Sequence, residues 1–443
     1  MALNGISKLG FETFRARRKR FMEKIAGAVA IFPSAPVSTR NSDVEFVYRQ
    51  DSDFYYLTGF AEPESVALLA PGDPEGEFVL FLRPRDKERE TWTGRRAGVE
   101  GAMTVFGADK AYPIDELGKI LPRFLQARER VYFPLGDNEK LNDRILSMVR
   151  ESGALRERIG SGPSAMLDPR ELVHEMRLFK SAEELAAMRR AIAISGEAHR
   201  EAMLKARGGM MEWSVEALID YKFRVNGAAG PSYPSIVASG ENATILHYIT
   251  NDRELRAGDL LLIDAGCEYD FYASDITRTF PVGAKFTPLQ RDLYELVLQS
   301  QSSGIEAVKP GAKFDDPHDA SLRVLVEGMI HHKLLSGSVD EILAKQSYRR
   351  FYMHRTSHWL GMDVHDVGLY RREGESRRLE PGMVLTVEPG LYIPADDDTV
   401  PEEMRGIGIR IEDDVLVTEQ GREVMSAAIS KSTSEIEALT TAG

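Results

Sequence analysis

The segment from Leu262 to Val282 (LIDAGCEYDFYASDITRTFPV) constrains the fold most, because it places two aspartates in apolar, strand-like runs. If the two runs pair as a hairpin that turns at Tyr269–Asp270, Asp264 and Asp275 lie directly opposite each other, with Cβ atoms about 5 Å apart. Two carboxylates this close repel each other in apolar surroundings, so shared protons, an Arg or Lys side chain, or metal must neutralise them. The alternative is that one of these aspartates only caps a turn.

Histidines gather in a second segment, HRTSHWLGMDVHDVG, which runs from His354 to Gly368 and holds three of the nine in the chain. His354 and His358 have the spacing of a zincin site, but that motif needs Glu after the first His, where this chain has Arg355. We therefore reject the zincin interpretation. A lone histidine is usually structural, and His247 in NATILHYI, taken alone, is expected in the core. Three close together favour a functional site.

Two late glutamates belong to strand-like runs. Glu388 ends the apolar part of LTVEPGLYI, and GIGIRIEDD (residues 406–414) directs its isoleucines to one face while Arg410 and Glu412 share the other. A solvated edge strand is the alternative for the second run.

The charges of these residues suit two metal ions. Four carboxylates carry −4, two divalent cations carry +4, and one neutral histidine completes the ligand set. Carboxylate-rich ligands favour manganese-like ions. Two metals about 3.5–4 Å apart suit hydrolysis at a carbonyl or phosphoryl centre.

The length of 443 residues predicts two domains. Short apolar runs alternate with helical segments in the first part, which predicts an α/β domain. Residues 160–169 are expected to form a linker, and Ser181 with Glu184 forms a capping box at the start of a long helix. We place the N-terminal domain at residues 1–172 and the catalytic domain at 173–443. The expected strands are Ala28–Phe32, Val66–Leu69, Phe78–Leu82 and Val131–Pro134, and the expected helices include Phe11–Ile25, Ile114–Leu125, Trp213–Asn226, Pro288–Val308 and Phe314–His332.

The composition of the chain disfavours several classes of binding partner. A net charge of −13 disfavours nucleic acid and anionic membranes. No run reaches the roughly 20 apolar residues of a membrane span, and a secretory signal is not expected. The single cysteine, Cys267, indicates a reducing compartment, so we expect a cytoplasmic protein. Strand alternation directs Cys267 away from Asp264, and we expect a buried hydrophobe and not a ligand.

The second domain resembles the pita-bread metallopeptidases, which include methionine aminopeptidases, prolidases and aminopeptidase P. The resemblance is closest to aminopeptidase P (Xaa-Pro aminopeptidase). Four runs carry it: SHWLGMDVHDVG, DAGCEYDFYASDITRTFPV, VLTVEPGLYI and GIGIRIEDD; YRQDSDFYYLTGFAEPES and VHEMRLFKSAEE extend it into the first part of the chain. The family's ligand order is matched by Asp264, Asp275, His358, Glu388 and Glu412.

The resemblance implies an α+β pita-bread catalytic domain and an enzyme with two divalent metal ions, with manganese expected. It implies hydrolysis of the bond between a peptide's first residue and a following proline, with a metal-bridging hydroxide as nucleophile and Glu388 as proton carrier. It also implies a homo-oligomer, a dimer or tetramer. The residues implied near substrate or ligands are His247, His354, His365, Arg410, Tyr392 and Trp92.

One departure from the family pattern concerns substrate choice. Arg355 and Thr356 stand where relatives have Gly and Leu, and a cation beside the pocket can alter substrate preference. Three alternatives stay open: a prolidase that cuts Xaa-Pro dipeptides, a metal-free pita-bread binding protein, and creatinase-like hydrolysis without metal. The complete set of ligand types argues against the last two.

Overall fold

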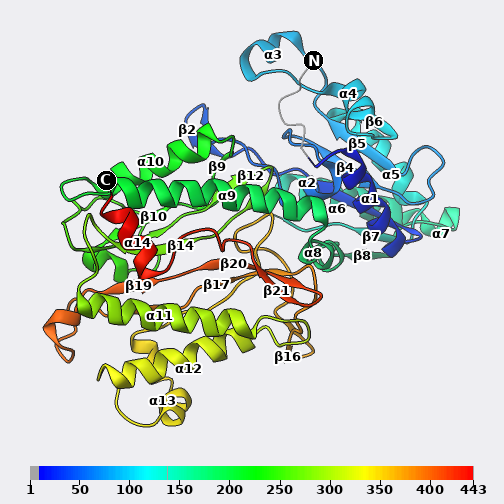
Figure 1. The fold of residues 1–443 in the computed structure, drawn as a ribbon. Helices are drawn as coiled ribbons and strands as arrows, with labels where there is room; N and C mark the ends of the chain where they lie inside the picture. The colour runs from blue at the N-terminus through cyan, green and yellow to red at the C-terminus, as the bar shows by residue number, and fades with distance from the viewer. Residues whose placement is uncertain (1–8, 137, 443) are drawn as a thin grey trace. The chain divides into compact units, whose positions relative to one another are not determined.

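The computed structural model describes residues 9–136 and 138–442, and the chain divides into two compact units, Met1–Arg177 and Leu178–Gly443 (Figure 1). The predicted boundary after residue 172 falls within helix α8 (Arg170–Leu178), close to this division. No helix in the described part of the chain is long and apolar enough to cross a membrane.

The first unit is an α/β domain, as predicted. Its six-stranded sheet has the order β6-β5-β4-β1-β7-β8 and is mixed, because β1 runs antiparallel to β4 but parallel to β7. All four predicted strands lie in this sheet. The strands are β1 (Ala28–Pro33), β4 (Val66–Leu69), β5 (Phe78–Leu82), β6 (Lys110–Pro113), β7 (Arg130–Tyr132) and β8 (Ala165–Leu167), and helices α1 (Phe11–Lys24), α5 (Leu117–Gln126) and α6 (Glu139–Ala154) belong to the same unit. Residues such as Val29, Leu68 and Phe124 form its buried core.

Two helix pairs frame the second unit. Helix α9 (Ala182–Lys205) packs on α10 (Glu212–Val225), and α11 (Pro288–Ala307) packs on α12 (Asp316–His331). The capping box at Ser181 begins α9 as predicted. Figure 1 shows strands of the second unit between the two helix pairs.

The strands of the second unit form small antiparallel sheets. One has the order β10-β11-β14 and another the order β17-β20-β21, while β18 pairs with β19. Their bounds are β10 (Ile236–Ser239), β11 (Leu260–Asp264), β14 (Thr277–Pro281), β17 (Val384–Val387), β18 (Gly390–Tyr392), β19 (Gly408–Arg410), β20 (Asp413–Thr418) and β21 (Gly421–Val424). Cys267 lies buried in β12 (Cys267–Tyr269), as predicted.

The hairpin register differs from the prediction. Asp264 pairs with Thr277 and not with Asp275, because the hairpin turns at Asp270–Phe271, where both residues have positive φ angles of 52° and 68°. The pairing is therefore displaced by two residues. An even displacement preserves the alternation of faces, so both aspartates still point to the same side. Regular pairing is interrupted at Gly266, where a Cβ atom would lie 1.8 Å from the Ser274 carbonyl oxygen.

Candidate metal centre and active site

A cavity of about 590 Å³ in the second unit brings together the residues that the sequence singled out. Its walls include all five predicted ligands and four of the six residues predicted near substrate or ligands: Asp264, Asp275, His358, Glu388, Glu412, His247, His354, His365 and Arg410. The rest of the lining is largely apolar, with Pro234, Ile236, Leu246, Ile249 and Val364. Trp92 belongs to helix α3 (Lys87–Thr93) of the first unit, where it is 84% exposed.

Strand ends position the acidic side chains. Asp264 is the last residue of β11, Glu388 directly follows β17, and Glu412 lies between β19 and β20. His358 lies outside any helix or strand, but its backbone is fixed beside β17. The His358 N–H donates to the Thr386 hydroxyl at 3.1 Å, and its carbonyl accepts from the Thr386 N–H at 3.0 Å.

The His358 imidazole is oriented as a metal ligand. Its Nδ1 lies 3.0 Å from the Trp359 carbonyl oxygen, which can only accept, so Nδ1 carries a proton and Nε2 is left to face the cavity. Nε2 lies 3.3 Å from Asp275 and 3.5 Å from Glu388. Ligand atoms of Asp275, His358 and Glu412 all lie within 4.8 Å of one another, which is close enough to share one ion.

The carboxylates of the cavity lack sufficient positive charge around them. Burial raises the pKa of Glu388 to about 7, and burial together with neighbouring carboxylates raises the pKa of Glu412 well above its usual range. Burial also raises the pKa of Asp275. His358 shows the counterpart: burial disfavours its charged form, but Asp275 and Glu388 outweigh this and raise its pKa to about 9. Cations bound at this site would therefore stabilise the charged forms of these carboxylates.

Tyr233 is a site residue that the sequence analysis missed. Its hydroxyl lies 2.7 Å from Asp264 and 2.6 Å from Asp275, so one phenol bridges the two aspartates. Burial, followed by the charges of these aspartates, raises its pKa well above the usual range, which keeps the phenol protonated. The only local signal is a tyrosine that precedes a proline in the run PSYPS.

A chain of hydrogen bonds orients His354. Its Nδ1 donates to the Arg355 carbonyl at 2.8 Å, so its Nε2 accepts from the Tyr392 hydroxyl at 2.9 Å. Tyr392 accepts in turn from Arg410 at 3.0 Å, and Arg410 donates to Asp264 at 2.7 Å. Burial lowers the pKa of His354 to about 3, so the imidazole is neutral.

His247 and His365 lie at the exposed part of the cavity wall. The expectation that His247, taken alone, is a core histidine is wrong, because its side chain is exposed although its neighbour Tyr248 is buried. The rings of His365 and His358 meet edge to face, with centroids 4.5 Å apart.

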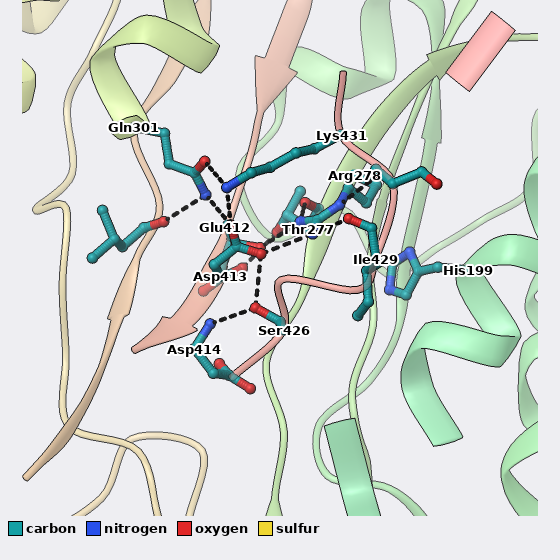
Figure 2. A network of polar contacts seen from close by, with 12 residues as sticks. His199, Thr277, Arg278, Gln301, Glu412, Asp413, Asp414, Ser426, Ile429 and Lys431 are labelled. Carbon is teal, nitrogen blue, oxygen red and sulfur yellow. Dashed lines mark hydrogen bonds and ion pairs between the residues drawn. The ribbon is translucent and has the colours of Figure 1, made fainter. Parts of the chain in front are cut away.

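A buried charged network supports Glu412 from behind (Figure 2). Arg278 is fully buried, donates to the Glu412 carbonyl at 2.6 Å and pairs with Asp413 at 2.8 Å. Figure 2 also shows Lys431 directed at Asp413. On the cavity side, the Thr277 hydroxyl donates to the Glu412 carboxylate at 2.6 Å. Sequence reasoning missed the contacts of Thr277 and Arg278 with Glu412 because they join residues more than 130 positions apart.

Arg355 and Thr356 attach the histidine segment to the start of α12. Thr356 is buried, and its hydroxyl lies 2.9 Å from His318 Nδ1. Arg355 forms an ion pair with Asp315. The Thr356 carbonyl also accepts a hydrogen bond from the Glu388 N–H at 2.9 Å. The segment that carries the histidines is thus fixed relative to the strand that carries Glu388.

Comparisons with known proteins agree with this geometry. Residues 186–419 match the model of Metallopeptidase family M24, and residues 14–132 match the model of the Aminopeptidase P, N-terminal domain. The chain is 46% identical to an Escherichia coli Xaa-Pro aminopeptidase over 98% of each chain. It is 43% identical to the Haemophilus influenzae Xaa-Pro aminopeptidase over 99% of each.

Solved structures show the same fold. Pseudomonas aeruginosa aminopeptidase PepP superposes with a TM-score of 0.95 at 50% identity, covering 98% of both chains. A zinc-substituted Escherichia coli aminopeptidase P in complex with product gives a TM-score of 0.93 at 46% identity, again over 98% of both chains. The chain described here is therefore a member of metallopeptidase family M24, in its aminopeptidase P group.

Proposed function

We propose that this chain is a Xaa-Pro aminopeptidase with two metal ions, which removes the first residue of a peptide when proline follows. The observation that carries the proposal is the convergence of one correctly oriented imidazole, His358, with carboxylates from four separate strand ends or loops in one cavity. The names of the relatives support the same activity.

The metal ligands in this proposal are Asp264, Asp275, His358, Glu388 and Glu412. Their oxygen-rich composition favours manganese. Two divalent cations held by these residues would activate a water molecule as the hydroxide nucleophile and would polarise the scissile carbonyl. The raised pKa values of Glu388 and Glu412 support this assignment, because bound cations would stabilise the charged carboxylates that burial and the neighbouring carboxylates disfavour.

The protein's own groups would position the substrate and move its protons. Glu388 faces His358 and His354, where its carboxylate can take a proton from water and pass it to the leaving proline nitrogen. His365 is placed at the wall to donate to a developing oxyanion. The proline ring suits the apolar wall, and its nitrogen offers no N–H that would need a partner.

A direct test compares an Ala-Pro dipeptide with an Ala-Pro-Ala tripeptide, with the protein first stripped by a chelator and then supplied with manganese. We expect metal-dependent release of alanine from the tripeptide. Cleavage of the dipeptide alone would replace the proposal with prolidase activity. Metal binding without turnover of either peptide would indicate a binding protein, and turnover after complete metal removal would support creatinase-like chemistry.

We also propose a cytoplasmic location. The single cysteine of the chain is buried and unpaired, which suits a reducing compartment.

A further inference from the structure

Arg355 is an exposed cation in the wall of the cavity. Of the described residues that line the cavity, two are arginines, and they differ in how exposed their side chains are and in the partners they bind. The Arg410 side chain is 4% exposed and is committed to Asp264 and Tyr392. The Arg355 side chain is 56% exposed and extends from the same segment as His354.

Arg355 shares its ion-pair partner with a second arginine. Its partner Asp315 accepts from Arg355 through one carboxylate oxygen and from Arg371 through the other, the latter at 2.9 Å. Two guanidinium groups therefore share one carboxylate. Exposed ion pairs of this kind hold their partners weakly, and Arg371 can neutralise Asp315 when Arg355 turns toward the cavity.

The direction of a bound peptide follows from exopeptidase chemistry. The first residue and its amine belong at the closed, acidic end, beside the metal ligands. The residues after proline must then run toward the open side, where His247, His365 and Arg355 are exposed. A carboxylate just after the proline would meet a cation there.

We propose that Arg355 gives this enzyme a preference for Xaa-Pro peptides that carry a negative charge on the residue after the proline. Such a charge is an acidic third residue or the free terminal carboxylate of a tripeptide. The proposal rests on the aminopeptidase function proposed above. The overall charge of −13 would on average repel anionic peptides, so a preference for them requires a local cation.

The test uses two peptides that differ only in charge, Ala-Pro-Glu-amide and Ala-Pro-Gln-amide. We expect the parent protein to favour the glutamate peptide by about two- to fivefold in kcat/KM, mainly through a lower KM. Added salt should reduce this ratio, since exposed charges are screened. Arg355→Gln should bring the ratio close to one.

Two matched variants address the shared carboxylate. Asp315→Asn frees Arg355 and should raise the ratio above that of the parent. Arg371→Gln removes an equal charge from the same cluster, but Arg371 does not line the cavity, so the ratio should stay above one. Thermal melting of each variant checks that it is folded.

The outcomes separate this proposal from the proposed function. Equal rates on both peptides by the parent, or a ratio that persists in folded Arg355→Gln, would overturn the role of Arg355 and leave the aminopeptidase function standing. Failure of the manganese-loaded parent to cleave either peptide would contradict the proposed function itself.

Discussion

The hydroxyl of Thr277 offers a sharp test of the metal centre. It is fully buried, donates to the Glu412 carboxylate at 2.6 Å, and accepts from Arg410 Nε at 3.2 Å. Thr277→Val keeps the shape of the side chain but removes both hydrogen bonds. Glu412 then loses the donor that orients its carboxylate toward Asp275 and His358.

The expected size of the effect follows from this contact. A hydrogen bond to a charged group contributes about 1.5–3 kcal/mol, and loss of a residue that orients a metal ligand typically weakens metal affinity by about 10- to 100-fold. We therefore expect the manganese dissociation constant of Thr277→Val to rise by about one to two orders of magnitude. Stability in metal-free buffer should fall by only about 1–2 kcal/mol.

Thr279 provides a matched control two residues further along β14. It is equally buried, but its hydroxyl donates to the Arg410 carbonyl at 2.9 Å and accepts the Arg410 N–H at 3.2 Å, so it contacts backbone only. Thr279→Val should lose similar stability while keeping its metal affinity. Titration calorimetry of chelator-stripped protein measures both variants. Equal manganese affinity in Thr277→Val and the parent, or an equal loss in Thr279→Val, would refute the reasoning.

Three further predictions concern other parts of the chain. Asp264→Ala should abolish metal-dependent hydrolysis yet melt cooperatively in metal-free buffer, and full activity of this variant with added manganese would rule out a metal at this position. Burial lowers the pKa of His199 to about 4, so its contribution to stability is present above about pH 6.5 and is lost as the pH falls toward 4, by about 2 kcal/mol at pH 5. The free energy of unfolding of His199→Gln, measured with urea, should accordingly fall less than that of the parent between about pH 7.5 and pH 5. Equal losses in the two proteins would contradict this assignment. We predict, from the family, association through the first unit, and a monomer mass in light scattering at micromolar concentration would refute it.

Much of the candidate site could be predicted because its residues lie in short runs with strong local patterns. Glu388 and Glu412 each interrupt an apolar or alternating run, and period-two alternation assigned Arg410 and Glu412 to one face. The hairpin illustrates the limit of this reasoning. Parity correctly placed Asp264 and Asp275 on one side, but the register depends on which two residues adopt positive φ, and the sequence did not distinguish Tyr269–Asp270 from Asp270–Phe271.

The supporting residues could not be found in this way. Tyr233 precedes Asp264 by 31 positions, and the Arg278–Asp413 ion pair joins residues 135 positions apart. Such contacts depend on how the sheets pack, and no local periodicity encodes that packing. His247 shows the converse error, because an apolar neighbourhood in sequence suggested burial while the fold exposes the ring at the cavity.

The buried Cys267 allows unfolding of this protein to be followed by thiol labelling without an added probe. It is the single thiol in 443 residues, and burial raises its pKa to about 11, so a folded molecule presents almost no reactive thiolate. A thiol reagent can therefore label the chain only when β12 opens to solvent. The labelling rate then measures how often the catalytic unit opens, without interference from the first unit, which contains no cysteine.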